Sequence, residues 1–333
     1  MPDQDHLYEK TGFGFATNKP NVGPLKDRFV MPPYSTLNTR DKHWQHRKRL
    51  WLAKGIQSEV GRDEHVKPTY AVAGMADYWK GAKRKDGSPK DSGTALERTS
   101  IFDPVLCELC YGWWCPPGGT VLDPFAGGSV RGIVASVLGL RYFGIELRAE
   151  QVKANRDQLG PATQGQHPPK WRQGDATKLT CKAPKVDFVF SCPPYGNLEV
   201  YSDDPEDLSN MTYQQFLRGY KSTIIQAVDR LKDNRFACFV VANYRSRDKD
   251  GKQLLDFVGD TVAAFEDAGA NYYNEVILIN AIGTGAMRTN NTFVRGNRKV
   301  VKMHQNVLVF CKGDPAEAAK HIPADSGVST GGN

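Results

Sequence analysis

The sequence lacks the features of a membrane or secreted protein. None of its apolar runs approaches the roughly 20 residues that would span a bilayer. Its first ten residues, MPDQDHLYEK, lack the basic and then apolar pattern of a signal peptide. The seven cysteines are an odd number scattered over 333 residues, which favours reduced thiols over a disulfide framework. We therefore expect a cytoplasmic protein with no membrane partner, and its 40% hydrophobic residues are enough for a substantial core.

Two common phosphate-binding patterns are missing as well. The stretch TVLDPFAGG contains no G-x-G-x-x-G, and no lysine follows it to hold a phosphate as in a P-loop. It does place Asp123 directly before a turn with Gly127 and Gly128, where a strand is expected to end. A carboxylate there would repel a pyrophosphate but suits a cationic ligand such as S-adenosylmethionine. Glu146 ends the next apolar run, close to the roughly 20-residue interval at which an acidic side chain holds a ribose.

From residue 100 onward, short apolar runs alternate with helical patterns, and no internal repeat is visible. The expected strands lie at 120–123, 141–147, 171–176, 186–192, 236–244, 274–280 and 305–313, and the expected helices at 130–140, 149–159, 213–232 and 254–269. This alternation predicts the α/β class, with a Rossmann-like, mostly parallel sheet and helices on both faces.

Positive charge is concentrated in the first third of the chain. The net charge is +7, and residues 40–54 read as a basic amphipathic helix containing Trp44 and Trp51. A second basic run at residues 80–90 is rich in Gly, Ser and Pro and is expected to be an exposed loop. Either run taken alone could be an ordinary solvated surface, but together they favour an anion-binding surface. We expect three parts: a basic N-terminal extension (1–98), a catalytic domain (99–313) and a disordered tail (314–333).

The stretch FVFSCPPYG, residues 188–196, places two prolines and a tyrosine directly after an apolar run. Together with VLDPFAGG and FGIEL upstream, SCPPY resembles the S-adenosylmethionine-dependent DNA amino-methyltransferase family, which methylates N6 of adenine or N4 of cytosine. The resemblance covers residues 100–313. The segment from residue 31 to residue 62 also looks like the leading region of phage-encoded members, which implies the cytoplasm of a bacterial or phage-infected cell.

The resemblance implies a Rossmann-like methyltransferase fold with S-adenosylmethionine as cofactor. In the family, a helix before the first strand touches the cofactor, and a carboxylate after the third strand lies near its adenine. The implied cofactor-binding residues are Phe102, Asp103, Asp123, Pro124, Phe125, Gly127, Glu146, Leu147, Asp175, Ala176 and Ser191.

The implied catalytic residues are Cys192, Pro193, Pro194 and Tyr195. The first side chain of the motif and a backbone carbonyl in the Pro-Pro segment accept hydrogen bonds from the amino group that is methylated. Tyr195 would stack on a base swung out of double-stranded DNA. An earlier MPPY, ending at Tyr34, has no glycine turn before it and is interpreted as a turn or packing element.

Cys192 departs from the family, which has Asp, Asn or Ser at this position. A thiol is a weak acceptor, and the alternative is a nucleophile that attacks C6 of a pyrimidine, as in C5-methyltransferases. Two further alternatives stay open: an RNA base methyltransferase, and an inactive DNA-binding protein with this fold. The residues expected to contact DNA are Arg47, Lys48, Arg49, Arg288, Arg295 and Lys299.

The segment CELCYGWWC brings Cys107, Cys110 and Cys115 close together in sequence. A single C-x-x-C without a second pair is a weak metal signal, and the segment is apolar enough for a core helix. We therefore expect no metal site.

Overall fold

The computed structural model describes residues 24–56, 102–160, 163, 165–196, 208–245, 253–280 and 285–324. The second basic run at residues 80–90 lies outside the described residues, as do Ile101 and the acidic stretch from Glu199 to Asp207. Among the helices in these ranges, none combines the length and apolar character needed to cross a bilayer.

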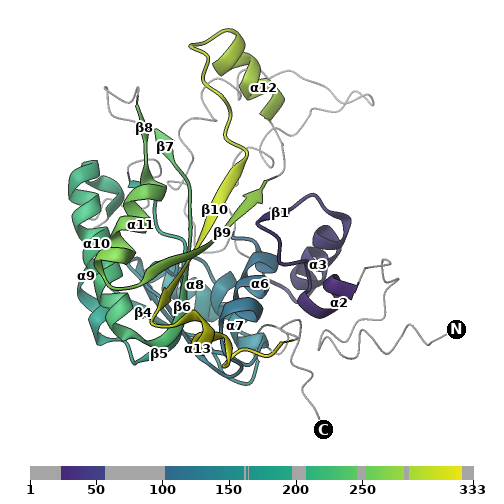
Figure 1. Cartoon of the computed structure of the whole chain (residues 1–333), viewed down its shortest axis with the longest axis vertical. Coiled ribbons are helices and arrows are strands. Elements are labelled where there is room, and N and C mark those ends of the chain that lie inside the picture. Colours follow the sequence, from purple (N-terminus) through teal and green to yellow (C-terminus); the bar gives the residue numbers. More distant parts are fainter. Residues whose placement is uncertain are drawn as a thin grey trace, which may run out of the picture.

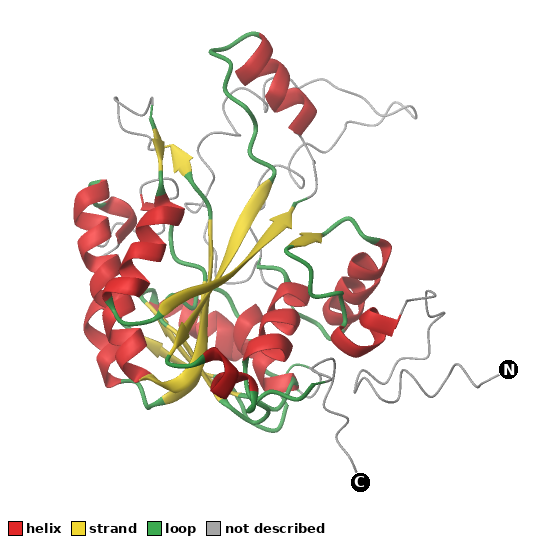
Figure 2. Cartoon of the chain, in the orientation of Figure 1, coloured by secondary structure: helices red, strands yellow, loops and turns green. Residues whose placement is uncertain are grey.

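A β-sheet forms the centre of the molecule (Figure 2). It has eight strands in the order β1-β9-β10-β6-β5-β2-β3-β4. The pairs from β4 to β6 are parallel, β10 is antiparallel to both of its neighbours, and β1 is parallel to β9. The strands are β1 (Thr36–Asn38), β2 (Thr120–Asp123), β3 (Arg141–Glu146), β4 (Lys170–Gln173), β5 (Val186–Ser191), β6 (Leu231–Val241), β9 (Asn271–Ile279) and β10 (His304–Lys312), with a separate hairpin of β7 (Tyr244–Arg245) and β8 (Leu254–Leu255).

Helices cover both faces of the sheet (Figure 1). The side chains of its strands alternate between the two faces. Phe188 and Phe190 of β5 belong to the core on the α6 face, whereas Val189 between them belongs to the core on the α10 face. The helical elements are α2 (Pro24–Phe29), α3 (Lys42–Ala53), α6 (Pro104–Trp114), α7 (Val130–Val137), α8 (Ala149–Asp157), α9 (Ala176–Leu179), η1 (Thr180–Lys182), η3 (Leu208–Asn210), α10 (Tyr213–Arg230), α11 (Phe257–Asp267), α12 (Gly285–Thr289), η4 (Asn290–Val294) and α13 (Pro315–Ala319). The predicted fold class, a Rossmann-like, mostly parallel sheet with helices on both faces, is confirmed.

Local sequence signals explain where two of the longer helices begin. Asp103 caps α6 by accepting from the backbone N–H of Val105, and Pro104 occupies the first turn, where no N–H is needed. Thr212 and Gln215 form a reciprocal capping box at the start of α10. The expected helix over 213–232 ends at Arg230 because the chain turns there into β6, which begins at Leu231.

The described part of the predicted N-terminal extension is joined to the catalytic domain. Strand β1 pairs with β9 in the central sheet, and α3 packs against α6. Trp44 and Trp51 of α3 are both fully buried. The amphipathic helix over residues 40–54 is confirmed, but its apolar side is part of the main core, so residues 24–56 are not a separate unit.

The predicted disorder of residues 314–333 is wrong for the part that the structure describes. Residues 315–319 form α13, capped by the Asp314 carboxylate, which accepts from Ala316. Ala318 is buried, and Ile322 packs against the core on the α6 face. Ala318 and Ile322 therefore pack on a hydrophobic surface that the sequence pattern did not indicate.

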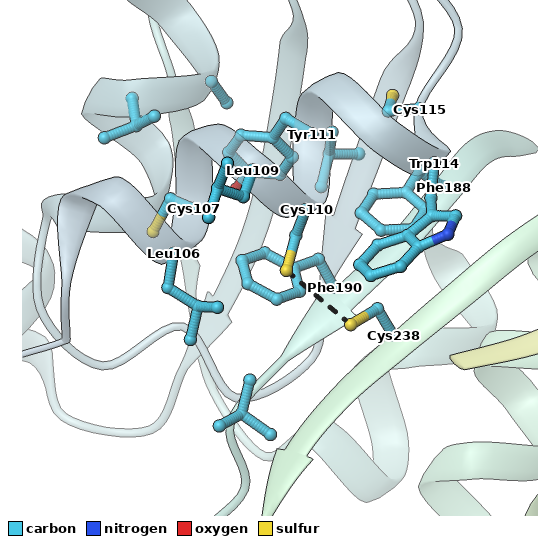
Figure 3. Close-up of a cluster of buried hydrophobic side chains, with 14 of the residues drawn as sticks. Leu106, Cys107, Leu109, Cys110, Tyr111, Trp114, Cys115, Phe188, Phe190 and Cys238 are labelled. Atoms are coloured by element: carbon cyan, nitrogen blue, oxygen red, sulfur yellow. Dashed lines mark hydrogen bonds between the residues drawn. The ribbon is translucent and has the colours of Figure 1, made fainter. Parts of the chain in front are cut away.

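The cysteine-rich segment is a core helix, as its apolar character suggested. Cys107 and Cys110 of α6 and Cys115 at its C-terminal cap are buried free thiols, and the Cys238 thiol of β6 donates to Cys110 at 3.9 Å (Figure 3). Burial raises the pKa of Cys107 and Cys110 well above the usual range, which keeps both as thiols. Thiols are poor metal ligands compared with thiolates, so this environment favours packing over metal binding.

Candidate active site

The parallel strands bring the two sequence motifs to one edge of the sheet. Asp123 ends β2, Glu146 ends β3 and Ser191 ends β5, and these three strands are neighbours. Asp175 follows β4 two residues after its end. Because all four strands run the same way, these residues share the carboxyl edge, where open α/β sheets bind ligands. Most of the predicted cofactor residues are thus brought together.

The turn after β2 leaves open space beside a glycine with positive φ. Gly127 has φ +53°, which side chains with a Cβ rarely adopt, and a Cβ placed there would meet no atom within 4 Å. Glu146 accepts from the Gly127 N–H at 2.9 Å and from the Arg148 N–H at 3.0 Å. The Glu146 side chain is 13% exposed and also pairs with the Arg148 guanidinium at 3.9 Å. Open space therefore lies beside a turn that carries a reachable carboxylate.

Asp123 does not face open space, contrary to the prediction that its charge would meet the cofactor. It is fully buried, and Arg131 of α7 donates to it at 2.5 Å. The Tyr142 hydroxyl and the Ser191 hydroxyl each donate to the same carboxylate at 2.6 Å. The carboxylate is enclosed because a residue on the next helix supplies its counter-charge. Asp123 is therefore a structural centre beneath the turn.

Arg131 also supports the turn itself. Its Nη2 donates to the carbonyls of Phe125 at 2.6 Å and Ala126 at 2.9 Å. Burial opposes the charge of Arg131, but Asp123 and Tyr142 outweigh that effect and raise the pKa of the guanidinium above its usual range. Arg131 stays cationic and fixes three positions of the turn at once.

The residues before α6 approach the same network. The Arg131 guanidinium lies 4.6 Å from the centre of the Phe102 ring, which contacts Phe190 edge-on. The Asp103 carboxylate is occupied by the cap of α6 and by Lys48, which donates at 2.8 Å. The Asp103 carboxylate therefore links the start of α6 to α3.

The remaining predicted cofactor residues surround this turn or lie at the end of β4. Asp175 caps α9 by accepting from the backbone and hydroxyl of Thr177, and its side chain is 11% exposed. Ala176 and Leu147 are partly buried, and the Leu147 carbonyl accepts from Gln173. Phe125 packs against Tyr220 and Phe239, which orients the turn that also contains Pro124.

The predicted catalytic segment, Cys192 to Tyr195, continues directly from β5. Ser191 links it to the cofactor turn, since its hydroxyl donates to Asp123 and accepts from the Phe125 N–H at 3.3 Å. Cys192 is partly buried and packs against the core on the α6 face. Pro193 is buried and Pro194 is partly exposed. The structure therefore places both motifs next to each other through one serine.

Aromatic residues from other elements hold Tyr195. Its ring contacts Tyr244 and Phe257 edge-on, with centroids 5.7 and 5.9 Å away, and Gln305 of β10 donates to its hydroxyl at 3.2 Å. Gly196 follows with φ +48°, and a Cβ there would lie 2.5 Å from the Tyr244 hydroxyl oxygen. The Tyr195 ring is partly buried and is held in place by these contacts.

Sequence reasoning did not identify Arg131, Tyr142, Gly196 or Gln305. The glycine directly after the motif tyrosine was a usable signal, because a glycine in that place indicates close packing or positive φ. Gln305 had no such signal, since the antiparallel insertion of β10 next to β6 brings it to Tyr195.

The N-terminal basic residues are used differently from the prediction. Arg47 is 5% exposed and forms a buried ion pair with Glu108 of α6, to which Trp51 also donates at 2.9 Å. A guanidinium enclosed in this way cannot contact a phosphate, so the predicted DNA contact of Arg47 is wrong. Lys48 is partly exposed in its pair with Asp103, and Arg49 is exposed. Only Arg49 keeps the position expected of a phosphate contact.

The other predicted DNA residues lie in the segment between β9 and β10. Arg288 of α12 and Arg295 are exposed, and Lys299 is partly buried. Figure 1 shows that α12 stands away from the sheet, on the side from which β10 enters it.

No protein-family model matches the chain, and no curated protein matches it in sequence. Solved structures are similar in fold. TrmN from Thermus thermophilus is 15% identical, with a TM-score of 0.42 over 63% of this chain and 49% of TrmN, so the chain spans about half of TrmN's length. A TehB-like SAM-dependent methyltransferase from Corynebacterium glutamicum is 15% identical, with a TM-score of 0.39 over 72% of this chain and 96% of its own. TTHA0409, a candidate DNA modification methylase also from Thermus thermophilus, is 15% identical, with a TM-score of 0.30 over 42% of this chain and 51% of its own.

Proposed function

We propose that the protein transfers a methyl group from S-adenosylmethionine to the exocyclic amino group of a base in DNA, N6 of adenine or N4 of cytosine. The observation that carries this proposal is the direct link between the glycine turn and the SCPPY segment. Ser191 bonds to both Asp123 and Phe125 and is followed at once by the segment that ends in Tyr195. A donor of methyl groups and an acceptor base can thus meet at one sheet edge.

The cofactor, when bound, supplies an electrophilic methyl group. The residues present fit it, because the open space at Gly127 admits a ligand against the backbone and Glu146 can accept from ribose hydroxyls. Asp175 would lie on the adenine side. Asp123, held by Arg131, would act on the cofactor only by shaping the turn.

On the acceptor side, the chain's own residues orient the amino group. Pro193 and Pro194 have no N–H, so their backbone offers the amino group carbonyl acceptors and no donor. Acceptors for these hydrogens free the nitrogen lone pair from conjugation with the ring and align it for an in-line displacement. The ring of Tyr195 would stack on the base. The proton released from the amino group would pass to solvent or to one of these acceptors.

The test is methyl transfer from labelled S-adenosylmethionine to genomic DNA and, separately, to RNA, followed by mass spectrometry of nucleosides. We expect N6-methyladenine or N4-methylcytosine in DNA and no label in RNA. Label in RNA alone would show that RNA and not DNA is the substrate. Label at C5 of a pyrimidine would show that the enzyme methylates carbon and not an amino group. Cys192→Ser should stay active, because a hydroxyl is a better acceptor than a thiol; loss of activity with a trapped enzyme–DNA complex in the parent protein supports the nucleophilic alternative.

A further inference from the structure

Residues 285–303 form an ordered protrusion between β9 and β10, consisting of α12, η4 and the segment that returns to β10. Its base is closed by the Asn280 N–H, which donates to the Met303 carbonyl at 2.9 Å. Its interior is held by Thr292, whose hydroxyl donates to the carbonyls of Arg288 and Lys299, while the Lys299 N–H donates back to Thr292. Figures 1 and 2 show this protrusion reaching beyond the rest of the described molecule.

Two valines of the protrusion are exposed to an unusual degree. Val300 is 76% exposed and Val294 is 62% exposed, the two highest values among the exposed large apolar side chains of the described residues. Both lie within two positions of the Thr292–Lys299 pair that closes the loop. Both side chains are therefore available for contact with a partner.

The charge around these valines selects the kind of partner. The protrusion contains Arg288, Arg295, Arg298, Lys299 and Lys302 and no acidic residue. Arg295 and Arg298 are exposed, and the Arg298 guanidinium lies over the Phe293 ring at 5.3 Å. Apolar side chains framed by cations fit a polyanion with an apolar interior, and the stacked bases of DNA have that character.

The position of the protrusion connects it to the candidate active site. Because β10 is antiparallel to β6, the protrusion leaves the sheet at the edge where β5 and β6 end. Gln305, two residues beyond the protrusion, donates to the Tyr195 hydroxyl. A duplex held by the protrusion would therefore lie at the edge where a displaced base must enter.

We propose that Val294 and Val300 insert into the stack of double-stranded DNA beside the target base, while Arg295 and Arg298 hold the flanking phosphates. This proposal rests on the proposed function and names the double-stranded form of its substrate. A base that leaves the helix loses stacking and pairing energy, and apolar side chains that fill the gap recover part of that loss. The valines are thus expected to matter for a paired base and not for one that is already unpaired.

The experiment compares two DNA substrates with the double variant Val294→Ser/Val300→Ser. Labelled methyl transfer is measured on native genomic DNA and on the same DNA after heat denaturation. We expect transfer to native DNA to fall about tenfold or more and transfer to denatured DNA to fall less than about twofold. The matched control is Ile225→Ser on α10, where a side chain 51% exposed lies outside the protrusion and should leave both rates unchanged.

Three results would overturn the proposal. Equal loss on both DNA forms would make the valines a general contact, and no loss would make them ordinary surface residues. A parent dimer that becomes monomeric in the variant by gel filtration would assign the valines to a second copy of the chain. If the parent protein methylates neither DNA form, the proposed function fails. The insertion proposal is then tested by DNA binding. It requires that the double variant lose affinity for native DNA and keep its affinity for denatured DNA.

Discussion

At the scale of single residues, the same chemical group serves different ends according to its burial. Asp123 and Glu146 are both carboxylates at strand ends, but the first is fully buried and the second is partly exposed. Arg131, Tyr142 and Ser191 all donate to Asp123. Glu146 instead accepts from the backbone N–H groups of Gly127 and Arg148, beside the open space at the turn. Stability is therefore expected to depend on Asp123 and cofactor affinity on Glu146.

The first prediction separates these two carboxylates. Asp123→Ala leaves Arg131 buried without its counter-charge and should reduce the free energy of unfolding by about 3–5 kcal/mol. Glu146→Gln keeps the shape of the side chain and should weaken S-adenosylmethionine binding while the unfolding midpoint stays near that of the parent protein. Urea unfolding and calorimetric titration measure the two effects. A stable Asp123→Ala protein with weakened cofactor binding would contradict this prediction and indicate that Asp123 contacts the cofactor directly.

The second prediction concerns Tyr195. Tyr195→Ala should raise the activation free energy of methyl transfer by about 1–3 kcal/mol, the contribution of base stacking. Tyr195→Phe retains the ring and its edge contacts with Tyr244 and Phe257, losing only the hydroxyl that accepts from Gln305. It should therefore keep most of the activity. The measurement is the steady-state rate of methyl transfer to DNA for both variants. Similar losses in Tyr195→Ala and Tyr195→Phe would show that the hydroxyl and not the ring is needed.

At the scale of elements, the basic residues of α3 have two different roles: some pair with carboxylates of the core and one is exposed on the surface. Its residues Arg47 and Lys48 reach Glu108 and Asp103 of α6, whereas Arg49 points away from that contact and is exposed. Consecutive positions on a helix are about 100° apart, so one helix can pair with the core on one side and offer a cation on another. The main role of α3, which follows β1, is therefore to pack against α6, and only part of its charge remains for DNA.

The third prediction uses this division. Arg49→Ala should flatten the slope of log DNA affinity against log salt by about 0.9 and leave stability within about 0.5 kcal/mol. Arg47→Ala should leave Glu108 buried without its cation and cost about 3–5 kcal/mol of stability. Fluorescence anisotropy over a salt series and thermal unfolding provide the measurements. An unchanged slope in Arg49→Ala would contradict a phosphate contact of Arg49.

The fourth prediction concerns the junction of β2, β5 and β6 at Asp187. Burial would raise the pKa of Asp187, but hydrogen bonds from Lys232, the Thr120 N–H and Arg235 outweigh it and hold the pKa below the usual 3.8. A carboxyl whose pKa is lower in the folded state stabilises the fold above its unfolded value, and that stabilisation is lost as the pH falls through the folded value. Asp187→Asn should therefore destabilise at pH 7, and its difference from the parent should shrink below about pH 4 in urea unfolding. A difference that does not change with pH would show that the charge contributes nothing.

At the scale of the whole molecule, both ends of the described chain close onto the central sheet. β1 extends the sheet beyond β9, and α13 packs on β6 and β10 at the opposite end of those strands from the protrusion. Gly313 makes this return possible with φ +90°, and the Asp314 N–H donates to Asn234 at 2.9 Å. The segments at the two ends are therefore part of one cooperative unit with the catalytic domain.

The fifth prediction compares two truncations. Removal of residues 314–333 exposes the surface covered by Ala318 and Ile322 and should cost about 1–3 kcal/mol, equivalent to a fall of several degrees in the unfolding temperature. Removal of residues 325–333 alone is the control and should leave that temperature unchanged. Differential scanning calorimetry measures both, and equal stability of the two truncated proteins would contradict a structural role for α13.

The sequence by itself determined the main alternation of strands and helices between residues 120 and 313 and the two motifs at the sheet edge, but not the β7–β8 hairpin or α12. Those features depend on local periodicity, glycine turns and proline positions, which act over a few residues. Only the tertiary structure decided that Asp123 is enclosed by Arg131 and that Arg47 pairs with Glu108, because a charge becomes structural when distant elements bury it together. The contact of Gln305 with Tyr195 likewise required the antiparallel placement of β10, which no local pattern specifies.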